Sequence, residues 1–254
     1  MNPGQELVDL QETLYASSNP TRRWLHCSRR DWIISALRRY ASTSNNRLET
    51  ALEVGPGSGV YLPTLCEIFP TVYGTDIEPA YLDHSRPLQD KYAHLSLIVD
   101  DITNSKLPAH SFDLILCTEV IEHISDSKSA LCGMHNLLKP GGLLILSTPQ
   151  RYSPLELTAK IAFLPGVIQL VRLIYQEPIL DSGHINLMTD TEVTKQLHAV
   201  GFEIEERHKT GLYLPLVAEF ARHQGLAIEQ RLEQKIRGGM LDWLLWTQYF
   251  VAKA

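Results

Sequence analysis

The chain has 254 residues, of which 44% are hydrophobic and 20% are charged, and its formal net charge is −6. This composition excludes a disordered chain and suits one large α/β domain, or one domain with an elaborated cap. The acidic balance disfavours nucleic acid as a partner, because proteins that bind nucleic acid usually present a basic surface.

The cysteines and histidines give no sign of a metal site. The four cysteines contain no CxxC pair, and the ten histidines show neither HxH nor HxxxH spacing. We therefore expect no metal, reduced cysteines and a cytoplasmic protein. The first residues do not read as a signal peptide, and no apolar run reaches the ~20 residues of a membrane span.

Residues 1–46 are predicted to form a helical cap that precedes the first strand. Trp24, Trp32, Ile33, Leu37 and Tyr40 recur at helical spacing, with pairs of arginines between them. A polar, serine-rich stretch over residues 41–46 then predicts a linker into the sheet.

A predicted buried strand ending at Val54 runs directly into a glycine-rich turn, Gly55-Pro56-Gly57-Ser58-Gly59. Such a turn belongs at the carboxyl edge of a parallel sheet, where open α/β sheets bind ligands. The dinucleotide fingerprint G-x-G-x-x-G requires a third glycine where this chain has Val60. A second strand ends at Asp76, which can accept two hydrogen bonds from a ribose diol.

Residues 53–59 match the motif acidic-x-Gly-x-Gly-x-Gly at every position. In this the chain resembles the class I S-adenosylmethionine (SAM)-dependent methyltransferases, over roughly residues 48–150. The resemblance implies an α/β fold: a Rossmann-like, doubly wound sheet of seven mostly parallel strands with an antiparallel last strand. It implies SAM as the cofactor and a SAM-binding domain over residues 47–254. The cofactor contacts it implies around the motif and the second strand are Glu53, Gly55, Pro56, Gly57, Gly59, Asp76 and Ile77. The competing interpretation is a glycine turn without a cofactor.

The resemblance also gives the N-terminal cap a role. In this family a helical cap often closes over the cofactor, where an arginine can meet the carboxylate of the methionine moiety. Arg29 and Arg30 are the candidates, and we assign Arg30 to the cofactor site. The alternative is that these arginines form an ordinary solvated helix face.

Helices are predicted over residues 60–69 and 79–92, and a third strand over 95–99. That strand ends in Asp100-Asp101-Ile102. By register with the family, Asp101 holds the adenine amino group and Ile102 stacks on the ring, with Asp100 as the alternative acid. An aspartate that caps a helix is the other interpretation.

A fourth strand over residues 111–117 runs into Thr118-Glu119-Val120-Ile121-Glu122-His123. This segment closely matches that of the ubiquinone-biosynthesis O-methyltransferases, which implies that Thr118 and Glu119 flank the cofactor. His123 is the candidate base, with Glu122 beside it, and a helical segment would place Glu119 and His123 on one face. The alternative is that the Glu/His pair caps the helix and orders the loop.

A turn over residues 139–142 precedes a fifth strand, after which residues 151–183 form an insertion predicted as two short helices divided by Pro165. We expect a lid that shapes an apolar acceptor pocket. Peripheral membrane contact through residues 155–175 is the alternative, which the few cations there disfavour. The resembled O-methyltransferases also carry an insertion here, followed by a Gly-x-His-like segment. Its nearest match is Ser182-Gly183-His184, so His184 is a second candidate for proton transfer.

The remaining elements complete the predicted sheet. A helix begins at Asp190, with Thr189 or Asp190 as its cap, and a sixth strand covers residues 201–206. A turn over 209–213 and a helix over 226–236 follow. Residues 243–251 predict the last strand, antiparallel beside the sixth.

Methyl transfer from SAM to a small hydrophobic or amphipathic acceptor is the leading functional prediction. O-methylation of a quinone, phenol or lipid-like molecule is favoured, with C- or N-methylation as variants. An NAD(P)-binding oxidoreductase is the first alternative, and Val60 argues against it. A non-catalytic SAM-binding protein is the second. No feature of the sequence sets an oligomeric state.

Overall fold

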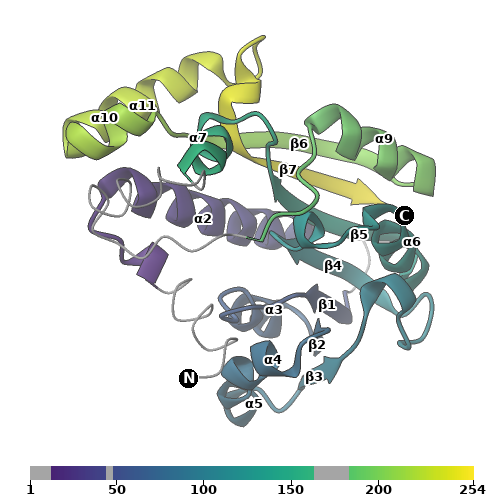
Figure 1. Ribbon diagram of the computed structural model, residues 1–254. Helices are drawn as coiled ribbons and strands as arrows, with labels where there is room; N and C mark the ends of the chain where they lie inside the picture. Colours follow the sequence, from purple (N-terminus) through teal and green to yellow (C-terminus); the bar gives the residue numbers. More distant parts are fainter. Residues whose placement is uncertain (1–12, 44–47, 163–182) are drawn as a thin grey trace.

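The computed structural model of the chain describes residues 13–43, 48–162 and 183–254. At its centre is a seven-stranded sheet in the order β3-β2-β1-β4-β5-β7-β6 (Figure 1). Strands β1 to β5 are parallel, and β7 runs antiparallel between β5 and β6. The predicted fold class is therefore confirmed. The strands are β1 (Thr50–Val54), β2 (Thr71–Asp76), β3 (Leu95–Val99), β4 (Phe112–Thr118), β5 (Leu138–Pro149), β6 (Glu203–Leu212) and β7 (Leu245–Lys253).

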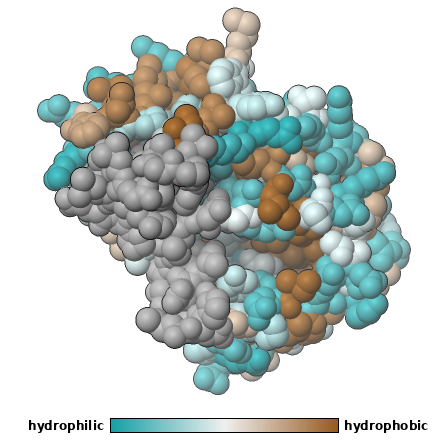
Figure 2. Space-filling model, viewed as in Figure 1, coloured by the Kyte–Doolittle hydropathy of each residue, from teal (hydrophilic) through white to brown (hydrophobic). Residues whose placement is uncertain are grey.

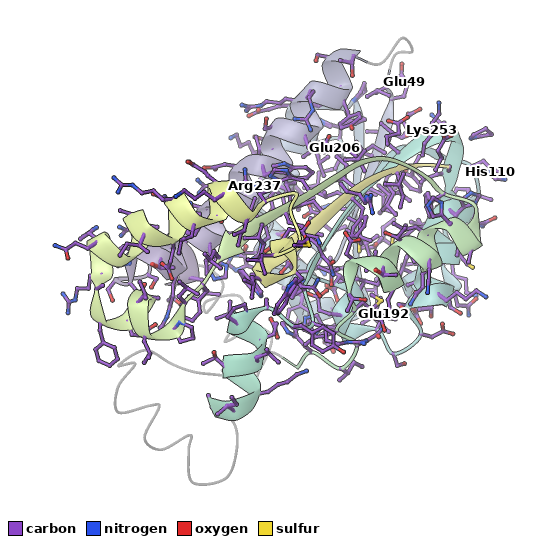
Figure 3. All side chains as sticks on the ribbon, turned by 90° about the horizontal axis from the view of Figure 1, so that it is seen from above. Glu49, His110, Glu192, Glu206, Arg237 and Lys253 are labelled. Carbon is purple, nitrogen blue, oxygen red and sulfur yellow. The ribbon has the colours of Figure 1, made fainter. Side chains whose placement is uncertain are left out.

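Helices cover both faces of the sheet. On one face lie α2 (Pro20–Thr43) and α3 (Leu62–Ile68), and on the other α6 (Ser127–Leu137) and α9 (Asp190–Val200). Figure 3 shows the two layers, with Glu206 and Arg237 toward α2 and α11 and Glu192 on α9. The other helices are α4 (Pro79–Ser85), α5 (Pro87–Lys91), η1 (Ile102–Asn104), η2 (Ile121–His123), α7 (Pro154–Ala162), α10 (Pro215–Phe220), α11 (Arg222–Ile236) and η3 (Asp242–Leu244).

Alternating strand residues supply the two halves of the core. In β4, Leu114 and Leu116 face the α2 layer, whereas Ile115 and Cys117 face the α6 layer. All four side chains are fully buried, as expected for a central parallel strand that is covered on both faces.

The sheet order reverses at β1, which lies between β2 and β4. In register, Val54 pairs with Thr75 on one side and with Cys117 on the other. The carboxyl ends of these three strands therefore meet at one edge. Open α/β sheets bind ligands at such a topological switch point, because the loops diverge there and leave a crevice.

Several predicted boundaries change. The single helix expected over residues 79–92 is two helices, α4 and α5, because Pro87 cannot donate the hydrogen bond that would continue the first. The turn expected over 209–213 lies largely within β6, which runs on to Leu212. The cap of α9 is Thr189, which forms a capping box with Glu192.

The insertion is described only in part. Its first predicted helix is confirmed as α7, whereas the second, near residues 167–175, lies outside the described residues. Figure 2 shows apolar side chains at the surface over α10 and α11, where Leu216, Phe220 and Ile228 are exposed. Among the described helices, none has both the length and the apolar character needed to cross a membrane.

Candidate active site

Close packing and backbone conformation require glycine at positions of the turn after β1. Gly55 and Gly57 have φ angles of 67° and 51°, which side-chain-bearing residues rarely adopt. The Gly55 N–H donates to the carbonyl of Thr75 at 2.7 Å. A Cβ atom on Gly55 would lie 2.4 Å from Cγ2 of Val120. The turn therefore brings bare backbone against the segment that follows β4.

A cavity of about 70 Å³ lies between this turn, α2 and the end of β4. Five of the predicted cofactor residues line it: Gly55, Pro56, Gly57, Thr118 and Glu119. The other residues around it are Leu14, Tyr15, His26, Arg29, Ser58, Val60 and Tyr61. The cavity is too small for a nucleoside, which would have to extend along the open sheet edge beyond it.

The arginine that lines this cavity is Arg29 and not Arg30, the residue that we assigned to the cofactor site from the sequence. The Arg30 side chain is half-buried, pairs with Asp31 and lies over the ring of Tyr15. Arg29 is one residue back on α2, a rotation of about 100° on the helix. That rotation turns its side chain inward, where it lines the cavity.

Arg29 forms an ion pair with Glu119, with Nη1 2.5 Å from Oε2, and the two side chains are only 11% and 18% exposed. The other Glu119 oxygen accepts from Ser147 Oγ at 2.9 Å. Burial lowers the pKa of Arg29, but the Glu119 carboxylate and the neighbouring tyrosines together outweigh burial, and the net shift is upward. Burial and the Arg29 charge lower the pKa of His26, so this histidine is neutral and its Nδ1 accepts from Arg29.

Glu53, the next-to-last residue of β1, carries a carboxyl group for which the described residues offer no hydrogen bond. It is 1% exposed, and neither oxygen has a partner among the described residues. Burial raises its pKa well above the ordinary value, because the charged form loses its hydration. A buried, unsatisfied polar group is destabilising, so its presence beside the glycine turn is a mark of a ligand site.

The tips of β2 and β3 form the open edge beside the cavity. The Asp76 carboxylate accepts from the Glu78 N–H at 2.9 Å, and burial raises its pKa. Ile77 and Val99 are 68% and 53% exposed. Two exposed aliphatic side chains at adjacent strand tips offer an apolar surface to a flat ring. Val99 was not predicted, because a strand-end valine looks like any other strand residue.

The acidic segment after β3 differs from its predicted role in one respect. Ile102 is 5% exposed and belongs to the α6-side core, so its side chain is not available to stack on a ring. Asp101 caps η1, with Oδ1 accepting from the Thr103 N–H at 2.9 Å. Asp100 accepts from the Lys106 N–H, while its buried Oδ2 has no partner within the described part of the chain.

The segment after β4 is not a regular helix. Glu119 adopts a φ of 55°, and only Ile121–His123 form a 3₁₀ turn. Glu119 therefore points to Arg29, while His123 points to the carbonyl of Gly183 at 3.2 Å. The segment is therefore not the helix that would have placed Glu119 and His123 on one face.

The three predicted catalytic residues do come together. One potential ligand atom from each of Glu122, His123 and His184 lies within 4.8 Å of the others. Glu122 is fully buried, and its Oε2 accepts from Thr148 Oγ1 at 2.9 Å. Burial and the Glu119 charge raise the pKa of Glu122 to about 8. The sequence places His184 61 residues after His123, so only the fold unites them.

Sequence reasoning missed two residues that support this cluster. His184 Nδ1 lies 3.3 Å from Glu156 Oε2, and Glu156 Oε1 accepts from Trp246 Nε1 at 2.9 Å. Burial lowers the pKa of His184, but Glu156, Glu122 and Glu119 together outweigh burial, and the net shift is upward. Arg29 lies over the ring of Trp246, 5.2 Å from its centroid, so a chain of side-chain contacts links the cavity to the cluster. The sequence offered one signal for Glu156: it is the single acidic residue in the largely apolar start of the insertion.

One further spacing bears on the oxidoreductase alternative. Tyr249 and Lys253 have the Tyr-x-x-x-Lys spacing, but both lie on β7, where four residues span about 13 Å. Tyr249 is fully buried and hydrogen-bonds to Thr210, whereas Lys253 is exposed. These two side chains therefore cannot act on one substrate.

Comparison with known proteins agrees with this arrangement. Residues 25–207 match the model of a family described as a methyltransferase domain. A probable SAM-dependent methyltransferase from Mycolicibacterium smegmatis is 28% identical over 75% of this chain and 66% of its own length. A ubiquinone biosynthesis O-methyltransferase from Alkalilimnicola ehrlichii is 32% identical over 39% of this chain and 41% of its own.

A solved structure of a SAM-dependent methyltransferase from Aquifex aeolicus superposes with a TM-score of 0.58. It is 12% identical and covers 100% of this chain and 99% of that one, so it shows the shared fold. The sequence matches span no more than about two thirds of these curated relatives. The family match covers well over half of this chain, which therefore belongs to the methyltransferase-domain family, with the fold of its class I, SAM-dependent members.

Proposed function

We propose that this protein transfers the methyl group of SAM to an oxygen atom of a small apolar or amphipathic acceptor. The observation that carries the proposal is the side-chain-free turn at the β1/β4 switch point, which faces the buried Arg29–Glu119 pair. A dinucleotide would meet the same turn without the third glycine of its fingerprint, where this chain has Val60.

The residues present fit SAM. The orphaned Glu53 carboxyl and the turn that a Cβ on Gly55 would obstruct are both features of a prepared ligand site. Arg29 would receive the methionine carboxylate in place of Glu119, and Asp76 the ribose hydroxyls. Ile77 and Val99 would contact the adenine ring, with Asp100 or Asp101 at its amino group.

SAM supplies an electrophilic methyl group on a sulfonium. The protein's task is then to place an acceptor oxygen behind that methyl and to exclude water, and positioning of this kind is worth about 7–11 kcal/mol in good models. If the oxygen arrives as a hydroxyl, a base must take its proton. The cluster of Glu122, His123 and His184 is adjacent to Glu119 and would supply the base that takes this proton.

Two observations favour an oxygen acceptor of apolar character. Two ubiquinone biosynthesis O-methyltransferases are 32% and 31% identical to this chain over 39% and 41% of its length. The insertion that begins with α7 is largely apolar, and α7 leaves Leu157 and Ile161 exposed. We propose that this helix belongs to a lid over the acceptor.

Calorimetric titration with SAM tests the cofactor site. Asp76→Asn is expected to weaken SAM binding by at least tenfold, because it removes a charged acceptor from the ribose. Asp90→Asn, an exposed aspartate on α5, is the matched control and should bind as the parent does. Equal binding by the parent, Asp76→Asn and a Gly57→Val variant would contradict the site.

Methyl transfer is tested separately with radiolabelled SAM and a panel of catechols, phenols, carboxylic acids and amines. Label on an oxygen acceptor supports the proposal. SAM binding without transfer to any member would favour a non-catalytic protein, and quenching of NADH fluorescence without SAM binding would favour an oxidoreductase.

A further inference from the structure

We propose that the outer surface of α10, α11 and the segment that follows them binds an anionic lipid membrane. This surface consists of the exposed side chains of residues 216–243, which we call the α10–α11 face. Figure 1 shows the two helices together at the outside of the molecule, next to α7. Binding at this face does not depend on which acceptor the enzyme methylates.

The α10–α11 face exposes large apolar side chains in pairs one helical turn apart. Leu216 and Phe220 on α10 are 75% and 72% exposed. Ile228 and Leu232 on α11 are 46% and 38% exposed. Residues four apart share a helix face, and Figure 2 shows apolar side chains gathered over both helices. Single exposed apolar residues are ordinary in a protein, whereas a group of them marks a contact surface.

The acids of the same segment turn into the protein. Residues 216–243 contain four acids, each of which accepts from a protein donor: Glu219, Glu229, Glu233 and Asp242. Glu229 is fully buried and accepts from a hydroxyl group of α2 at 2.6 Å. Glu233 is 3% exposed and accepts from a backbone N–H of β6 at 2.8 Å. The negative charges therefore lie on the inner side of the two helices.

The cations of the segment remain on the outer side. Arg222, Arg231 and Lys235 are exposed, and none of them forms an ion pair with a described residue. Arg231 lies three positions after Ile228, and Lys235 three positions after Leu232, so the cations border the apolar side chains. On a chain whose net charge is −6, this face is thus both apolar and cationic.

Charge decides which occupant fits this face. A second copy of the chain would set the same cations against each other, since a twofold contact pairs a surface with itself. Anionic lipid headgroups complement the cations, and the acyl region accepts apolar side chains without requiring a matching shape. Helices that carry arginine and lysine beside leucine and phenylalanine are typical of the membrane interface.

The segment after α11 adds a residue suited to that interface. All four tryptophans lie in the described part of the chain, and of these only Trp243 is exposed. Met240 and Leu241, which precede it, are 96% and 50% exposed. Tryptophan is enriched at the level of the headgroups, because its ring is apolar and its N–H is polar. Trp243 therefore provides a local signal for insertion.

The position of the face also bears on the insertion after β5. Residues 155–175 carry few cations, which disfavours membrane contact through that segment alone. α10 packs against α7, the described start of the insertion. The α10–α11 face thus supplies, next to the insertion, the cations in which the insertion is poor.

Sedimentation of the full chain with vesicles tests the charge. One set is made of equal parts phosphatidylglycerol and phosphatidylcholine, and the other of phosphatidylcholine alone. We expect binding to the first and much weaker binding to the second, since each cation near an anionic surface adds about fivefold in affinity. R231Q/K235Q should bind the anionic vesicles at least tenfold more weakly. K128Q/K195Q, at exposed lysines of α6 and α9, is the matched control and should bind as the parent does.

Salt and apolar substitutions test the two contributions separately. Raising the salt from about 0.1 M to about 1 M shortens the screening length from about 10 Å to about 3 Å and should weaken binding as R231Q/K235Q does. L216S/F220S should also lose most of the binding, whereas L216M/F220L, which keeps the apolar area, should retain it. Binding should shift the tryptophan emission to shorter wavelength, and W243F should remove that shift. The melting temperature of each variant shows whether it is folded.

Four results would overturn the proposal. The first is no binding to anionic vesicles by the parent, and the second is binding that R231Q/K235Q and L216S/F220S both leave unchanged. The third is a dimer, detected by light scattering at rising protein concentration, that L216S/F220S dissociates, because this would assign the face to a second copy. The fourth is binding of soluble polyglutamate as tight as that of anionic vesicles, without the emission shift, which would assign the face to an acidic protein.

Discussion

Arg29 on α2 and Glu119 after β4 form an ion pair across the mouth of the candidate site, with Nη1 2.5 Å from Oε2. The pair joins the N-terminal helix to the switch point of the sheet, 90 positions further along the chain. Because both side chains are largely buried, any ligand carboxylate that reaches Arg29 has to replace Glu119. The ion pair thus occupies in the free protein a contact that we assign to the cofactor.

Replacing Arg29 should therefore weaken SAM binding. Arg29→Met alone would leave the Glu119 charge buried and unpaired, which is strongly destabilising. We therefore expect the double variant R29M/E119Q to fold and to bind SAM about 10- to 100-fold more weakly, as the loss of a charged hydrogen bond predicts. Calorimetry measures this. Arg30→Met, at the neighbouring half-buried position, is the control, and weaker binding by that variant instead would restore the original assignment.

Substitution of Gly55 tests whether contact with Val120 determines the shape of the glycine turn. Gly55→Ala should destabilise the protein by about 1–3 kcal/mol, because the new Cβ would overlap Val120 and the φ of 67° is unfavourable for alanine. Val120→Ala in the same chain should recover part of this loss by removing the contacted methyl groups. Urea denaturation of the two single variants and the double variant gives the coupling. Strictly additive losses would show that the contact with Val120 is unimportant.

Glu53 should lower the stability of the SAM-free protein. Burial raises its folded-state pKa well above the ordinary 4.5, so the unfolded chain releases a proton that the folded chain retains. The stability of the parent therefore falls as pH rises from 4.5 toward the folded-state pKa. Glu53→Gln removes this dependence and should melt at a higher temperature than the parent at pH 8, with little difference near pH 4, while binding SAM more weakly. Thermal scans at both pH values check this, and a lower melting temperature at pH 8 would show that the carboxyl is satisfied.

The stability contribution of Asp113 should depend on pH in the opposite direction to that of Glu53. Burial raises its pKa, but Lys139 and the N–H groups of Glu49 and Thr50 outweigh burial and the net shift is downward. Its contribution is therefore complete above the ordinary pKa of 3.8 and is lost as pH falls through the lower folded-state value. Asp113→Asn should cost about 1–2 kcal/mol at pH 7, and the difference from the parent should shrink in acid. Denaturation at pH 7 and pH 3 measures it, and a constant difference would contradict the assignment.

The predictions that the structure confirms rest on short stretches of chain. The glycine turn and the alternation from strand to helix could be read locally, because φ preferences and hydrophobic periodicity act over a few residues. Element boundaries moved where a local signal competed with tertiary packing. Residues 209–213 look like a turn because of Gly211, yet they continue β6, since β7 pairs with them and Glu233 accepts from their N–H groups.

The side chains of the site were predicted less well because their direction depends on the fold. Arg29 and Arg30 are chemically alike, and only the packing of α2 on the sheet decides which one faces the cavity. Ile102 was assigned to the cofactor by position, but η1 turns it into the core. Glu156 and Trp246, 90 residues apart, meet only because α7 packs on β7.

By itself, the sequence determined the fold family and the cofactor class, because the backbone geometry of a glycine turn and the period of each element are local properties. The tertiary structure decided which charges meet: Arg29 with Glu119, His184 with Glu156, and the cluster around Glu122. Ion pairs and ligand sets of this kind depend on distances between segments far apart in the chain, and those distances exist only once the sheet has brought the segments together.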